Sequence, residues 1–161
     1  MFKKIIMVSA ILQGSSLMAV PCEPSPLGEE LFLRGGFNGW GETHELCYQG
    51  ENQYEVVLEV STLESKHFKI ATSDWLTLSC TIDSGYPSED IEVLLSEEAA
   101  MPIKLGEQMA LTCYNEDDRV AQGLSPIFNG LKYDFQLDAS YAFKLNLDPE
   151  TLEASLILSE Q

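Results

Sequence analysis

The segment from Tyr54 to Val60 alternates between apolar and other residues, and this alternation limits the fold more than any other feature of the chain. The apolar series is Tyr54, Val56, Leu58 and Val60. Glu55 and Glu59 take the opposite parity. Successive side chains of a β-strand point to opposite faces of a sheet, so the pattern predicts a half-buried antiparallel strand.

Similar short apolar runs, separated by turn residues such as Asn38-Gly39 and Asp148-Pro149, follow along the chain. We expect further strands at 31–33, 46–48, 67–71, 76–78, 103–106, 109–111, 133–137, 141–145 and 152–158. No sustained helical periodicity competes with them. The sequence therefore predicts an all-β fold, an antiparallel β-sandwich of about seven to nine strands.

The first residues have the pattern of an export signal. Lys3 and Lys4 precede an apolar run, and small residues near Ala19 suit a cleavage site, so we expect a signal peptide at 1–19. A proline-rich extended leader is expected at 20–30, followed by one sandwich domain at 31–161. Inserted loops are expected at 83–102 and 114–130. The chain is accordingly expected to be exported, to the periplasm or the extracellular space.

Four cysteines follow the expected cleavage site, which in an exported chain indicates two disulfides with three possible pairings. The pairing Cys80–Cys113 is favoured because the strand after Trp75 should lie beside the strand at 109–111, and Cys22–Cys47 then remains. A zinc site at His44 and Cys47 is the rival interpretation. No second close ligand pair accompanies it, so no metal is expected.

The formal net charge of −17 restricts the partners. Nucleic acid and anionic membrane surfaces would be repelled, so neither is expected as a partner. Neutral ligands and basic protein partners remain. Catalysis is also disfavoured, because the chain has no nucleophile elbow, phosphate loop or dinucleotide motif, and its two histidines stand in no recognisable catalytic frame. We expect no enzymatic activity and no cofactor.

Several segments carry a family resemblance when read in order. FLRGGFNGW, YEVVLEV, HFKIATSDW, IKLGEQMAL and AFKLNLDPETLEASLIL together resemble the immunoglobulin-like starch- and glycogen-binding modules found in pullulanases and in kinase β-subunits. The resemblance covers 31–82 and 103–158. It implies an immunoglobulin-like sandwich that binds α-glucan polysaccharides or oligosaccharides without catalysis. It also implies a sugar platform of Trp40 and Trp75, a hydroxyl contact from Lys69, and a late-loop contact from Asn129.

The chemistry of these side chains agrees with that interpretation. The C–H face of a pyranose ring packs on an aromatic ring, and its hydroxyl rim needs polar partners. Trp40 and Trp75 lie at turns, and Lys69 has the parity opposite to Phe68 and Ile70. The alternative is that both tryptophans cover the core and Lys69 is an ordinary surface lysine. A secreted acidic protein-interaction module without sugar binding would then be the better interpretation.

Overall fold

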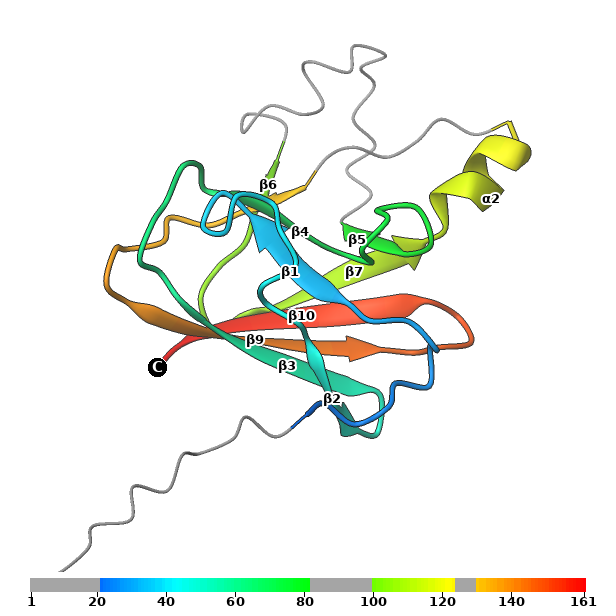
Figure 1. The fold of residues 1–161 in the computed structure, drawn as a ribbon, viewed down its shortest axis with the longest axis horizontal. Coiled ribbons are helices and arrows are strands. Elements are labelled where there is room, and N and C mark those ends of the chain that lie inside the picture. Colours follow the sequence, from blue (N-terminus) through cyan, green and yellow to red (C-terminus); the bar gives the residue numbers. More distant parts are fainter. Residues whose placement is uncertain (1–20, 82–99, 124–129) are drawn as a thin grey trace, which may run out of the picture.

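The computed structural model describes residues 21–81, 100–123 and 130–161, which form ten strands and one short helix (Figure 1). The strands are β1 (Phe32–Gly35), β2 (Cys47–Gly50), β3 (Gln53–Glu59), β4 (His67–Ala71), β5 (Ser79–Thr81), β6 (Met101–Pro102), β7 (Gln108–Tyr114), β8 (Leu131–Lys132), β9 (Ser140–Leu147) and β10 (Glu153–Glu160). The helix is α2 (Glu116–Ala121). The expected signal peptide lies outside the described residues, as do 83–99 and Asn129.

The strands form one hydrogen-bonded sheet that doubles over into two layers. Its order is β2-β3-β9-β10-β7-β5-β4-β8-β6, and β1 also pairs with β4. Phe68 of β4 packs edge-to-face on Phe143 of β9, which is not its neighbour in the sheet, with ring centroids 5.5 Å apart. In Figure 1, β1, β4 and β5 accordingly lie in a layer above β3, β9 and β10. The predicted all-β sandwich is confirmed, although β6 and β8 form one parallel pair.

The alternating segment behaves as its pattern predicts. Tyr54, Leu58 and Val60 are buried in the core, whereas Glu59 on the opposite face is exposed. β3 pairs with β9 along its whole length, so the core side chains of the two strands lie side by side. Full burial of such a side chain contributes about 1.5–3 kcal/mol, and this row forms one wall of the core.

Both predicted disulfides are present. Cys80 and Cys113 stand directly opposite each other on β5 and β7, with Cα atoms 4.0 Å apart. Cys22 and Cys47, with Cα atoms 4.9 Å apart, fasten the leader to β2. Two disulfides are typical of proteins that fold in an oxidising, exported environment. Within the described residues, no helix is both long and apolar enough to cross a membrane.

The predicted loop at 114–130 is wrong in its first part. Tyr114 still belongs to β7, where it pairs with Ser79, and residues 116–121 form α2. Asn115 caps this helix by accepting a hydrogen bond from the Asp118 N–H at 2.8 Å, and acidic side chains fill the first turn, where the helix dipole favours them. The predicted loop at 83–102 likewise ends early, because Met101 and Pro102 form β6.

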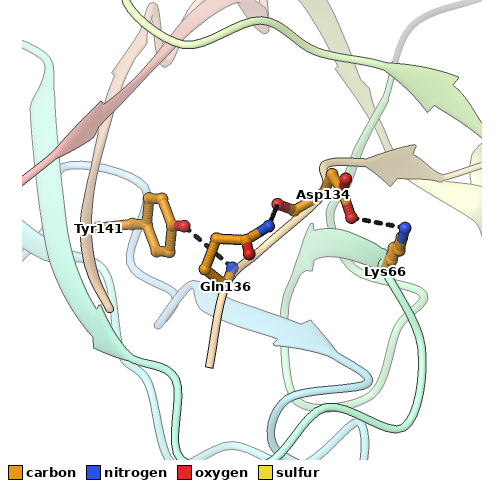
Figure 2. Close-up of polar contacts among 4 residues, drawn as sticks. All are labelled: Lys66, Asp134, Gln136 and Tyr141. Atoms are coloured by element: carbon orange, nitrogen blue, oxygen red, sulfur yellow. Dashed lines mark hydrogen bonds and ion pairs between the residues drawn. The ribbon is translucent and has the colours of Figure 1, made fainter. Parts of the chain in front are cut away.

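The predicted strand at 133–137 is instead an irregular loop, and the hydroxyl of Tyr141 holds it in place (Figure 2). This hydroxyl accepts a hydrogen bond from the Gln136 N–H at 3.0 Å. Asp134 in the same loop forms an ion pair with Lys66, which precedes β4. A tyrosine at the start of a strand that bonds back to the preceding loop is characteristic of immunoglobulin-like sandwiches.

Candidate functional site

Trp40 and Trp75 are carried by two turns, one after β1 and one after β4. β1 and β4 are antiparallel, so the turns leave opposite ends of the pair. Both turns nevertheless fold back over its outer face, and the two indole rings meet with centroids 6.1 Å apart and an interplanar angle of 46°. Each indole is partly exposed. The structure therefore brings together the two tryptophans that the sequence singled out.

Asn38 closes the turn that carries Trp40. Its side-chain oxygen accepts from the Gly35 N–H at 3.0 Å, and its amide nitrogen donates to the Leu33 carbonyl at 2.9 Å. The Trp40 N–H donates to the Gly35 carbonyl at 3.0 Å. Trp40 has a φ of 63°, a left-handed conformation that is rare for a bulky side chain.

Asp74 organises the second turn in the same manner. One carboxylate oxygen accepts from the Thr72 hydroxyl at 2.8 Å and from the N–H groups of Leu76 and Thr77, both at 3.0 Å. The other accepts from the Thr77 hydroxyl at 2.6 Å. The bonds from Thr77 are the main reason why the pKa of Asp74 lies well below its usual range. Trp75, the next residue, has a φ of 66°.

Arg34 joins the two turns. Its Nε donates to the Trp40 carbonyl at 2.9 Å, and Nη1 donates to the carbonyls of Thr72 at 3.0 Å and Ser73 at 2.8 Å. Its guanidinium carbon also lies 3.7 Å from the centroid of the Trp75 ring. Burial lowers the pKa of Arg34, but a guanidinium stays protonated in proteins. Arg34 therefore supports the Trp75 ring and fixes both turns.

A second link between the turns lies at their surface. Ser73 donates its hydroxyl hydrogen to Oε1 of Glu42 at 2.7 Å, and both residues are exposed. Glu42 follows Trp40 by two positions and Ser73 precedes Trp75 by two. These exposed groups are polar and belong to the two segments that carry the tryptophans.

Several polar side chains are buried in or next to β1, β4 and β5. Among the described residues they are Arg34, His67, Lys69, Thr72, Ser79, Thr81 and Glu116. His67 lies edge-to-face against Trp40, with ring centroids 5.0 Å apart. Gly130 leaves room for that imidazole, since a Cβ there would lie 2.3 Å from His67 Nε2. The tryptophans thus rest on a polar layer and not on the apolar core.

Lys69 lies on the predicted face but not in the predicted environment. Phe68 and Ile70 point into the core, so Lys69 points outward, directly opposite Arg34 in the β1–β4 register. The expectation of a solvent-facing lysine is wrong, because Lys69 is only 8% exposed. Burial lowers its pKa to about 8, and the negative charge of Glu116 partly opposes this shift. A direct contact with a surface-bound ligand is therefore disfavoured for Lys69.

Sequence reasoning missed Arg34, and it identified Asn38 and Asp74 only as turn residues, without their bonds to the backbone. For the last two a local signal exists, because Asn and Asp commonly bond to backbone groups two or three residues onward in turns. For Arg34 there is no local signal, since its acceptors lie up to 39 positions away in the sequence. In the described ranges, no three His, Cys, Asp or Glu side chains gather as a metal-binding group. Comparison with family models, curated proteins and solved structures found no match to this chain.

Proposed function

We propose that this protein is an exported, non-catalytic carbohydrate-binding protein that recognises α-glucans through Trp40 and Trp75. One observation carries the proposal: the two indoles meet at 6.1 Å and both remain partly exposed. Aromatic faces of this kind match the C–H face of a glucose ring. Export to the periplasm or the extracellular space belongs to the same proposal and is supported by the two disulfides.

The backbone beneath the rings supports a binding role. Both tryptophans adopt the left-handed conformation, which costs a bulky side chain about 1–2 kcal/mol at each position. Conformations of this kind persist where the surrounding structure imposes them, and they gather at binding sites. Here the surrounding structure is the pair of Asx-type turns and the guanidinium of Arg34. The rings are therefore held in place before any ligand arrives, which reduces the entropy lost on binding.

In the proposed site, the indoles contact the sugar ring and the exposed pair of Glu42 and Ser73 contacts its hydroxyls. Lys69 is left out of direct contact because of its burial. The contact from Asn129 remains a prediction from the family resemblance. The tilt of 46° between the rings suits a bent chain better than a flat one, because each ring then meets a differently oriented sugar. The glucose chains of starch and glycogen are helical and therefore bent in this sense.

Native electrophoresis through gels that contain soluble starch or glycogen tests the proposal. We expect the wild-type protein to be retarded, and a variant with Leu137→Ala, which alters an exposed side chain far from both turns in the sequence, to be retarded equally. Unretarded migration of the wild type would remove the glucan proposal. An acidic protein-interaction module with a basic partner would then be the remaining interpretation.

A further inference from the structure

The layer of β2, β3, β9, β10 and β7 lies on the other side of the core from the tryptophans. Its outer face carries a groove of about 340 Å³. Its polar lining comes from β2, β3, β7 and β9 and consists of Gln49, Gln53, Glu55, Gln108, Lys144 and Asn146. Ser155 and Ile157 of β10 also line it. Small-molecule sites typically measure about 300–1,000 Å³, so the groove is large enough for a ligand.

The strand register arranges these residues in two parallel rows across the sheet. In one row, Asn146 stands between Gln53 and Ser155. In the other, Lys144 stands between Glu55 and Ile157, and Gln108 is the next partner of Ile157. Neighbouring strands are about 4.8 Å apart, so the row that crosses four strands spans about 14 Å. The groove therefore offers hydrogen-bonding groups at regular intervals along an extended path.

Most of these groups have free hydrogen-bonding capacity. The side chains of Gln53, Gln108 and Asn146 make no hydrogen bond within the described part of the chain, whereas Gln49 donates to the Cys47 carbonyl at 3.1 Å. Glu55 and Lys144 oppose each other in register, and their charged atoms form no ion pair. A carboxamide offers two donors and one acceptor oxygen, which is the combination that a hydroxyl-rich ligand needs.

The charge of the groove selects among possible occupants. The negative charge of Glu55 and the positive charge of Lys144 cancel each other, so the lining of the groove is neutral in a chain whose formal net charge is −17. A polyanion would be repelled by the chain as a whole, and a polycation would prefer its acidic surfaces. An apolar partner would leave the carboxamides desolvated and unpaired. A neutral ligand with many hydroxyls has none of these disadvantages.

We propose that the groove over β3, β9 and β10 is a second binding site, for an extended neutral oligosaccharide held by the carboxamides of Gln53, Asn146 and Gln108. The sugar units lie across the strands, and Ile157 supplies an apolar contact between Lys144 and Gln108. The site contains no tryptophan, so it does not depend on the proposal for Trp40 and Trp75. The two sites lie on outer faces of opposite layers, so one molecule can hold two chains of a polysaccharide at once.

Nuclear magnetic resonance separates the two sites in a single titration. The two tryptophans give two indole N–H signals, which report on one site, and the side-chain amide signals of Gln53 and Asn146 report on the other. The ligands to add are maltohexaose, cellohexaose and mannohexaose, with the acidic hexamer of galacturonate as a comparison. We expect at least one neutral hexamer to shift both amide signals, also in the Trp40→Ala/Trp75→Ala double variant.

A matched pair of variants tests where the ligand lies. Ser155→Phe adds a large ring inside the groove, next to Asn146, whereas Ser159→Phe places the same ring on the same strand and face outside the groove. We expect Ser155→Phe to weaken binding of the responding hexamer about tenfold or more, because it displaces hydrogen bonds, and Ser159→Phe to change it less than twofold.

The outcomes are distinct. Amide shifts without indole shifts support the groove and count against the glucan site at the tryptophans. Indole shifts alone overturn the groove, as does a response of the amides to the galacturonate hexamer only. If none of the four hexamers moves either set of signals, both proposals fail.

Discussion

The guanidinium carbon of Arg34 lies 3.7 Å from the centroid of the Trp75 ring, so a buried cation supports one of the two partly exposed indoles from below. The same guanidinium donates to the Trp40 carbonyl on the other turn. The position of the turn that carries Trp40 is thereby coupled to the position of the Trp75 ring. A change at Arg34 should alter both tryptophans together.

Replacing Arg34 tests this coupling. Arg34→Lys keeps the charge but loses the planar fork, so carbonyls of both turns lose their donors. We expect the free energy of unfolding, measured by urea denaturation, to fall by about 2–4 kcal/mol, and both indole N–H signals to shift. Arg119→Lys, the same exchange on a partly exposed arginine, should cost less than about 1 kcal/mol. A shift of the Trp75 signal alone would contradict the coupling.

Removal of either indole should weaken glucan binding. We expect Trp40→Ala and Trp75→Ala each to lower affinity about tenfold to a hundredfold, since each removes stacking area from the proposed platform. Affinity electrophoresis in gels of graded glycogen concentration measures the change. Circular dichroism serves as the control, because partly exposed rings outside the apolar core should leave the sheet intact. Unchanged retardation of both variants would exclude the tryptophans as the site.

Asp74 should make the second turn sensitive to acid. Its pKa in the folded protein is lowered, so its contribution to stability is complete above the unfolded-state pKa of about 3.9 and is lost as the pH falls further. We expect the difference in unfolding free energy between wild type and Asp74→Asn to be largest near neutrality and to shrink below roughly pH 4. Urea denaturation between pH 2 and 7, in steps of about one unit, measures it. A difference that is constant with pH would show that the carboxylate is not responsible.

Lys69 should make stability depend on pH in the same direction as Asp74, but in alkali. Its pKa of about 8 in the folded protein lies below the ordinary lysine value of 10.5, so between these values the unfolded chain binds more protons than the folded one. Stability attributable to Lys69 therefore rises as the pH increases through this interval. We expect wild type to gain stability relative to Lys69→Met from pH 8 to about pH 10. Urea denaturation of both proteins tests this, and parallel pH profiles would contradict it.

The two disulfides should contribute similarly to stability. Their cysteines are separated by 25 and 33 residues, and loops of this length predict about 3–4 kcal/mol each from restriction of the unfolded chain. The double variants Cys22→Ala/Cys47→Ala and Cys80→Ala/Cys113→Ala should lose about this amount in urea denaturation. Peptide mapping without reduction should yield the two cross-linked pairs, and a fragment that joins Cys22 to Cys80 would contradict the structure.

The sequence predicted those features that depend on local periodicity or on strand adjacency. The alternation at Tyr54–Val60 depends only on the two-residue repeat of a strand, so the core face of β3 was identified correctly. The pairing of Cys80 with Cys113 followed from placing their strands side by side, and the register puts them directly opposite each other. The capped helix α2 was missed, because six residues are too few to establish a helical period.

The candidate site was predicted less completely, because its chemistry depends on contacts between distant segments. Periodicity predicts that Lys69 points away from the core, but it does not reveal what covers that face of the sheet. The role of Arg34 depends on two turns that fold back to the same place. Trp40 and Trp75 were singled out by the family resemblance and by their positions at turns, and their contact with each other needed the tertiary structure.

The left-handed backbone under both indoles sets stability against function at these two positions. Glycine adopts this conformation without steric cost, so Trp40→Gly and Trp75→Gly would relieve strain that alanine would retain. A protein selected in the laboratory for heat resistance alone would therefore tend to lose its rings here. In the proposed function, tryptophan is kept at these positions for its aromatic surface, at the cost of backbone strain.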